Sequence, residues 1–167
     1  MTDIIDREQA LMDLLASEWD TTQVRGYDVN DGSLPMADSI HNVGAVYPSL
    51  VVTYSNETSP GDSSYSYQTN TGPGSINNGT LIATARAEEK DTGYENDGGT
   101  AVDADTIAKE IIHHVREIVR ANPTGGSTDF NVLGTTKGAD IPDDLEQTPP
   151  VMMEQANILY AFDETPD

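Results

Sequence analysis

The fold is decided by the stretch VDADTIAKEIIHHVREIVRA, residues 102–121. Its apolar side chains recur every three or four residues, a spacing that places them on one stripe of an amphipathic α-helix. The stripe consists of Ile107, Ile111, His114, Val115, Ile118 and Val119. Thr100 or Asp103 can cap the start of this helix, and Asn122-Pro123 ends it. The sequence therefore predicts one long helix that packs against another apolar surface.

A second amphipathic helix is predicted over residues 3–19. Its apolar positions again fall near one stripe, with the acidic residues mostly outside it. They are Ile4, Leu11, Leu14, Leu15 and Trp19. Thr2 or Asp3 can cap its start, because a short polar side chain there accepts a hydrogen bond from the first turn.

Five runs between and after the helices have the composition or the alternation of β-strands. They span residues 47–54, 65–69, 80–89, 128–136 and 151–162. In the third run Leu81, Ala83, Ala85 and Ala87 share one face, which we expect to be buried. Asn78-Gly79 is a strong turn signal, so we expect a hairpin between 65–69 and 80–88.

This order of elements predicts an α+β fold. We expect a mainly antiparallel sheet of about four to five strands, with the two helices packed on one face. Polar, Gly- and Pro-rich segments at 55–64, 90–100 and 138–150 are expected to be loops. The length fits a single domain over 1–167, with a frayed tail at 163–167.

The charge of the chain is far from balanced. Asp and Glu number 29 against 8 Lys and Arg, which gives a formal net charge of −21 over 167 residues. Such a chain repels itself unless salt screens the charges; the screening length falls from about 10 Å at 0.1 M salt to about 3 Å at 1 M. The composition therefore indicates adaptation to molar salt, as in a haloarchaeon or a virus that infects one.

Composition also excludes several classes of function. The chain has no cysteine, so disulfides, zinc–thiolate sites and cysteine nucleophiles are excluded. No apolar run approaches the roughly 20 residues of a membrane span, and residues 1–7 do not resemble a signal peptide. The shortage of Lys and Arg argues against direct binding to the phosphate backbone of nucleic acids. We expect a protein of the cytoplasm, or of a particle assembled there, without a membrane partner.

Two patterns invite a metal interpretation. His113 and Glu117 lie four residues apart on the long helix, but a zinc site needs three or four ligands and His41 is distant in sequence. The acidic segments 28–32 and 95–99 resemble calcium loops, yet their glycines are out of place for that motif. In a chain this acidic, a surface pair and chance matches are the favoured interpretations, so we expect no metal site.

No pattern points to catalysis or to a cofactor. Residues 71–75 are Gly-rich but lack the Lys-Ser/Thr and the helix that follow in a phosphate loop. Asn56-Glu57-Thr58 and Asn78-Gly79-Thr80 match the glycosylation sequon, but we expect them to form turns. Carboxylates are too abundant to single out an acid–base pair. We expect a protein that is not an enzyme, with no catalytic residues.

Taken whole, the order of elements resembles the tail terminator, or tail-completion, proteins of long-tailed viruses. The resemblance rests on the strand Tyr47 to Tyr54, the strand Thr80 to Glu89 and the strand Met152 to Phe162. It also rests on the helix opened by Asp103-Ala104-Asp105, with Ile107, Ala108, Ile111 and Ile112, and covers about residues 3–163. It is a likeness of pattern and size and involves no signature motif.

The resemblance implies a structural virion protein that forms a ring, expected to be a hexamer. The ring would cap the tail tube and join it to the neck or connector proteins below the head, and DNA would pass through its lumen without specific binding. The family supplies no catalytic, cofactor or metal residues to carry over. With the salt adaptation, the resemblance points to a tailed virus of haloarchaea, with assembly in the host cytoplasm.

Two alternatives stay open on the sequence alone. Within virions, the chain could be a tail-tube or neck stopper subunit, which would contain more strand and less helix. Outside virions, it could be a small haloarchaeal cytoplasmic enzyme or ligand-binding domain. Turnover of a metabolite, or a metal retained through His113 and Glu117, would favour that second alternative.

Overall fold

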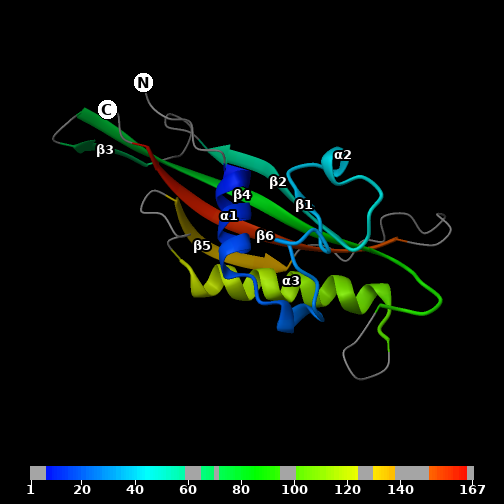
Figure 1. Ribbon diagram of the computed structural model, residues 1–167. Coiled ribbons are helices and arrows are strands. Elements are labelled where there is room, and N and C mark those ends of the chain that lie inside the picture. The colour runs from blue at the N-terminus through cyan, green and yellow to red at the C-terminus, as the bar shows by residue number, and fades with distance from the viewer. Residues whose placement is uncertain are drawn as a thin grey trace.

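The computed structural model describes residues 7–58, 65–69, 72–94, 101–123, 130–137 and 151–164. The helices are α1 (Arg7–Glu18), the 3-10 turn η1 (Thr21–Val24), α2 (Ile40–Val43) and α3 (Ala104–Ala121). The strands are β1 (Met36–Ala37), β2 (Ser49–Thr58), β3 (Tyr65–Thr69), β4 (Gly72–Glu88), β5 (Phe130–Lys137) and β6 (Val151–Glu164). Figure 1 shows these elements. Both predicted helices and all five predicted strands are present among the described residues.

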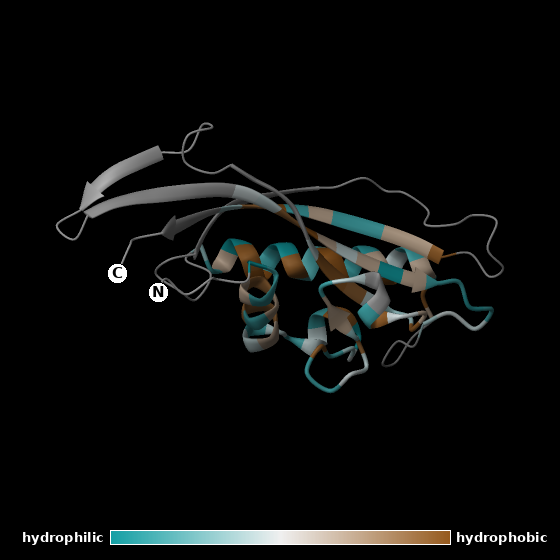
Figure 2. Ribbon diagram, turned by 90° about the horizontal axis from the view of Figure 1, so that it is seen from above, coloured by the Kyte–Doolittle hydropathy of each residue, from teal (hydrophilic) through white to brown (hydrophobic). Residues whose placement is uncertain are grey.

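The strands form one sheet in the order β1-β2-β4-β6-β5, and β3 pairs with β4 beyond the end of β2. Every pairing is antiparallel except that of β1 with β2. Helices α1 and α3 lie on the same side of the sheet (Figure 2). The predicted α+β class is therefore confirmed, and the two-residue strand β1 adds an edge strand to the sheet, within a segment expected to be a loop with one short strand.

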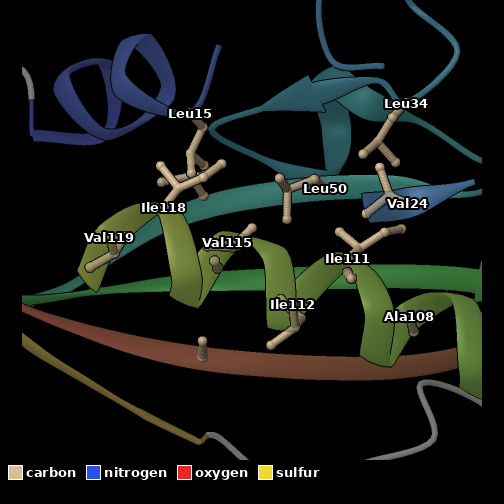
Figure 3. Packing of buried hydrophobic residues seen from close by; sticks show 14 of the residues in the cluster. Leu15, Val24, Leu34, Leu50, Ala108, Ile111, Ile112, Val115, Ile118 and Val119 are labelled. Atoms are coloured by element: carbon tan, nitrogen blue, oxygen red, sulfur yellow. The ribbon is translucent and has the colours of Figure 1, made fainter. Parts of the chain in front are cut away.

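The apolar core lies between this face of the sheet and the two helices (Figure 3). On β4 the alternate residues Leu81, Ala83, Ala85 and Ala87 are fully buried, as their period of two predicted. The small alanines let α3 approach the sheet closely. From α3 the core receives Ile107, Ala108, Ile111, Ile112, Val115, Ile118 and Val119. Each large apolar side chain buried here stabilises the fold by roughly 1.5–3 kcal/mol.

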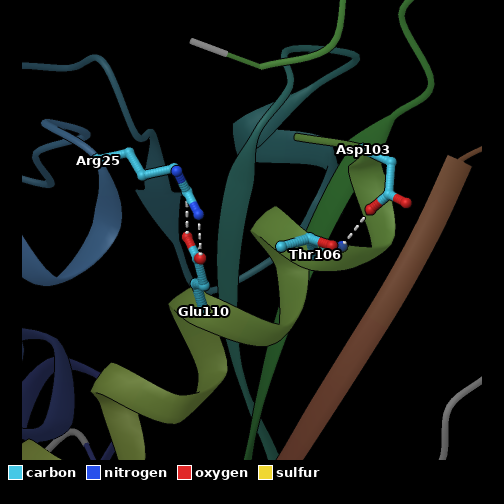
Figure 4. A network of polar contacts seen from close by, with 4 residues as sticks. All are labelled: Arg25, Asp103, Thr106 and Glu110. Carbon is cyan, nitrogen blue, oxygen red and sulfur yellow. Dashed lines mark hydrogen bonds and ion pairs between the residues drawn. The ribbon is translucent and has the colours of Figure 1, made fainter. Parts of the chain in front are cut away.

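Helix α3 begins where its predicted cap stands. The Asp103 carboxylate accepts a hydrogen bond from the Thr106 backbone N–H at 2.8 Å, as Figure 4 shows. Hydrogen bonds from Thr106 hold the pKa of Asp103 below its usual value. Of the two caps that the sequence allowed, the structure uses Asp103.

The turn predicted at Asn78-Gly79 was wrong. Both residues lie inside β4, where Asn78 pairs with Thr58 of β2 on one side and with Ala161 of β6 on the other. Pairing on both sides outweighs the local turn preference of Asn-Gly. The sequons at 56–58 and 78–80 therefore lie in paired strands, and the hairpin joins β3 to residues 72–76 of β4.

Strand β4 is much longer than the helix that packs on it. Its 17 residues span about 56 Å at about 3.3 Å per residue. The 18 residues of α3 span only about 27 Å at 1.5 Å per residue. The N-terminal end of β4, with β3 beside it, therefore extends past α3, as Figure 1 shows. We call residues 65–69 and 72–76 the sheet extension.

The remaining loop predictions are met in part. Residues 55–58 continue β2 instead of starting a loop, and β6 runs to Glu164, into the tail expected to fray. Residues 90–93 form the start of the loop predicted at 90–100. Residues 1–6, 59–64, 70–71, 95–100, 124–129, 138–150 and 165–167 lie outside the described residues. Within the described part of the chain, no helix is both long and apolar enough to span a membrane.

Candidate functional site

A shallow hollow lies where the end of α1 and the turn η1 meet the C-terminal half of α3. Its volume is about 270 Å³. Its lining residues are Glu18, Asp20, Gln23, His114, Glu117, Ile118, Ala121 and Asn122. Three carboxylates and no Lys or Arg are among them, so we call it the acidic hollow.

The turn η1 holds Asp20 at the rim of the acidic hollow. The Asp20 carboxylate accepts hydrogen bonds from the Thr22 backbone N–H at 3.0 Å and from the Thr22 hydroxyl at 2.6 Å. These hydrogen bonds lower the pKa of Asp20, so the carboxylate stays negative into the acid range. Asp20 therefore both caps η1 and contributes charge to the hollow.

A bidentate ion pair fixes η1 to α3. The Arg25 guanidinium donates from Nε and one terminal nitrogen to the two oxygens of Glu110, both at 2.7 Å (Figure 4). This fork-to-carboxylate geometry is the strongest form of a side-chain ion pair. It couples the segment after α1 to the middle of α3 and so fixes the position of the hollow.

His114 forms the floor of the acidic hollow and is only 5% exposed. Its Nε2 accepts a hydrogen bond from the Asp20 backbone N–H at 3.0 Å, and the Trp19 ring packs edge-on at 4.7 Å between centroids. Nε2 must be unprotonated to accept, so the ring is neutral; burial lowers the pKa of His114 accordingly. Its Nδ1 is buried with no hydrogen-bond partner among the described residues. His114 belongs to the apolar stripe predicted for this helix, and the structure buries it with that stripe.

The candidate metal pair is an ordinary contact between exposed side chains one helical turn apart. His113 Nε2 lies 3.0 Å from Glu117 Oε1, with side chains 67% and 49% exposed. Within the described part of the chain, no three His, Asp or Glu side chains are grouped to hold a metal ion. The side chain of His41 lies outside the described residues.

The calcium-like segment 28–32 uses its acids to form a turn. Asp28 accepts from the Asn30 backbone N–H and Asp31 from the Ser33 backbone N–H, each at 2.8 Å. Hydrogen bonds from Ser33, chiefly from its side chain and then from its backbone N–H, lower the pKa of Asp31. The second segment, 95–99, lies outside the described residues. In the Gly-rich stretch 71–75, residues 72–75 lie in β4, paired with β3, and form no loop.

Helix α3 also carries a group of basic residues that the sequence reasoning did not single out. Lys109, His113, Arg116 and Arg120 stand at spacings of four, three and four residues. At about 100° per residue they fall within about 60° of one another, on the side of α3 turned away from the sheet. We call them the basic stripe. In the sequence, the stripe can be detected by the regular spacing of basic residues, which places them on a different face of the helix from the apolar stripe.

Comparisons with known proteins find similar solved structures but no match in sequence. No family model matches the chain, and no curated protein matches it. Among solved structures, a chain of the "Virion of native gene transfer agent (GTA) particle" is similar over 95% of this chain and 93% of its own length. The identity is 12% and the TM-score 0.42. The likeness therefore assigns neither a role nor a site to this chain.

Proposed function

We propose that the chain is a structural protein of a virion, and that it is the tail terminator subunit whose ring caps the tail tube. The observation that supports this most is the sheet extension: a paired strand ribbon continues beyond the helices that form the core. The element order on which the resemblance to tail terminators rests is present in the structure. A subunit built to contact neighbours needs such surfaces outside its own core.

A ring subunit must meet its neighbours sideways and two different partners along the axis. In this proposal the single domain provides side contacts through its sheet and α3, and its loops face the tail tube on one side and the neck or connector proteins on the other. A hexamer is the expected ring. Assembly takes place in the host cytoplasm, and no membrane or cofactor takes part.

The excess of acidic residues in the chain is compatible with a passage for DNA through the ring. Carboxylates facing the lumen would repel phosphates and keep the passing DNA from adhering. A structure of the assembled ring with neutral or basic side chains around the lumen would reject this part of the proposal.

The salt adaptation is a separate part of the proposal and has its own test. If the net charge of −21 reflects a haloarchaeal virus, the melting temperature should rise steeply between millimolar and molar salt. Circular dichroism at 222 nm would follow the loss of helix. A melting temperature that does not change over this range would contradict a halophilic origin.

Deletion of the gene from the encoding virus tests the role most directly. Without a terminator, the tail tube should keep growing, so electron micrographs should show tails of variable length that are not joined to heads. Restoring the gene should restore uniform, attached tails. A deletion that removes the tubes altogether would favour a tube subunit, one that leaves closed tails of normal length beside unattached heads would favour a neck stopper, and intact infectious particles would end the virion proposal.

A further inference from the structure

The basic stripe is unusual for this chain. Only eight Lys and Arg occur in 167 residues, and three of them, Lys109, Arg116 and Arg120, lie on this one surface of α3 with His113. Lys109, His113 and Arg120 are exposed and Arg116 is half-buried. Over eleven residues the stripe is about 16 Å long, at 1.5 Å per residue.

Most of the other Lys and Arg side chains contact groups elsewhere in the same chain. Arg25 pairs with Glu110, Arg86 is buried and lies over the Tyr47 ring, and Lys90 lies over the Tyr94 ring. Within the stripe, Lys109 pairs with Asp105 at 2.8 Å. Arg116 and Arg120, by contrast, make no side-chain hydrogen bond or ion pair with any other described residue. Within the described part of the chain, no carboxylate neutralises these two charges, and we take them as the charges that a partner would meet.

Copies of a chain with a net charge of −21 repel one another, which favours contacts in which cations of one copy meet acids of the next. The acidic hollow is such a receiving surface, because it is concave, lined by Glu18, Asp20 and Glu117, and lacks any Lys or Arg. The buried Nδ1 of His114, which lacks a hydrogen-bond partner among the described residues, is a second unusual feature of its floor.

The geometry points to a head-to-tail contact: we propose that the basic stripe of one copy docks into the acidic hollow of a second copy of this chain. Arg116 and Arg120 would donate to the carboxylates of Glu18 and Glu117 of that copy. The hollow lies about a third of a turn around α3 from the stripe, so one chain can give and receive at the same time. Two different, complementary patches make a heterologous contact, which closes into a ring if its rotation allows.

This inference concerns how copies meet, and it depends on the proposed function only in requiring self-association. It holds for a ring in a tail, in a neck or in any other assembly. A failure to associate would therefore be distinct from absence of the protein from virions.

Charge reversal tests the contact. Sedimentation velocity and native mass spectrometry of the full chain are run from micromolar to millimolar concentration, at the lowest salt that keeps the native circular dichroism. We expect concentration-dependent oligomers for the unaltered chain and about tenfold weaker association for R120E, because an attraction becomes a repulsion. The neutral variant R120Q should fall between them. K90E makes the same change of charge at an exposed position outside the stripe, and should associate as the unaltered chain does.

An exchange of charges gives the sharpest outcome. R116E/R120E reverses the stripe, and E18K/E117K reverses the hollow. Each variant alone should stay monomeric, and a mixture should restore association between unlike chains. The proposal is overturned if the unaltered chain stays monomeric at millimolar concentration, if K90E weakens association as much as R120E, or if the mixture does not associate. Binding of a duplex DNA that R116E/R120E abolishes, without any change in self-association, would assign the stripe to nucleic acid instead.

Discussion

The two ends of β4 differ in almost every property that matters for this protein. The end at 81–87 is paired on both sides and covered by α3, with alternate residues fully buried. The end at 72–76 is paired with β3 throughout but with β6 only at Ser75 and Ile76, and it extends beyond the helix. One end supplies stability and the other supplies surface. A chain of this size can thus fold on its own core and still offer a long strand ribbon to neighbours.

The largest loss of stability should come from removing a core side chain of the helix that covers β4. Ile111→Ala removes a fully buried side chain from the layer between α3 and β4, and we expect a loss of about 3–4 kcal/mol of unfolding free energy. Val46 is an apolar control because its side chain is 51% exposed, so Val46→Ala should change stability by less than about 0.5 kcal/mol. Chemical denaturation measures both. Equal effects would show that the core does not lie where the structure places it.

A smaller loss should follow from disturbing the loop that leaves the covered end of β4. Tyr94 pairs with Val102 through two backbone hydrogen bonds of 2.7 and 3.0 Å. Gly93 has φ +68°, and a Cβ there would lie 2.8 Å from the Val102 carbonyl oxygen. Gly93→Ala should therefore cost about 2 kcal/mol.

The matched control for Gly93 is Gly32, which has φ +85° but open space around the point where a Cβ would stand, with no atom within 4 Å. Gly32→Ala should cost about 1 kcal/mol, because only the backbone strain remains. Thermal unfolding in molar salt compares the two. If Gly32→Ala were the more damaging change, the close packing of residues 93 and 102 would be refuted.

The N-terminal cap of α3 should contribute less again. Asp103→Ala removes the hydrogen bond to Thr106 and should cost about 1 kcal/mol. Because the pKa of Asp103 is lowered on folding, its contribution is present above the usual pKa of about 3.9 and is lost as the pH falls through the folded value. The unfolding free energies of the two proteins, measured by denaturation, should therefore differ at neutral pH and converge at acid pH. A difference that stays constant with pH would exclude the carboxylate as the cap.

The smallest effect should be a pH dependence centred on His114. Burial lowers its pKa, so its neutral form stabilises the fold fully above about 6.5, and this contribution is lost as the pH falls from there through the folded value. Asp20, Glu117 and His113 are the charged groups that influence it. His114→Gln keeps a possible acceptor for the Asp20 N–H and should flatten the stability profile between neutral and mildly acid pH. The same slope in both proteins would assign the dependence to other groups.

The sequence predicted what burial dictates. The apolar period of α3 and the alternation of Leu81, Ala83, Ala85 and Ala87 identified the core, because a buried face requires a strict period. The extent of β4 escaped prediction, because Gly72 to Gly79 consists of turn-forming residues that only partner strands hold extended. The same holds for η1 and α2, whose four residues each are too few to show a period.

The candidate site, like the fold, could be predicted from the sequence only in part. Asp103 as a cap and His114 as a member of the apolar stripe followed from local rules. The acidic hollow could not be predicted, because Glu18 and Asp20 meet Glu117 only after α1 packs against α3. The basic stripe could have been found by testing the outer face of α3 for a charge period as well as the inner face for an apolar one.

Hydrogen exchange along β4 tests the central claim, that this sheet consists of a core end and a contact end. In the isolated chain, amides of 81–87 should exchange only by global unfolding, whereas those of 72–76 should exchange through local opening and much faster. In purified assemblies, the amides of 72–76 should become protected while those of 81–87 change little. Equal protection of both ends in the isolated chain, or no gain at 72–76 on assembly, would contradict this account.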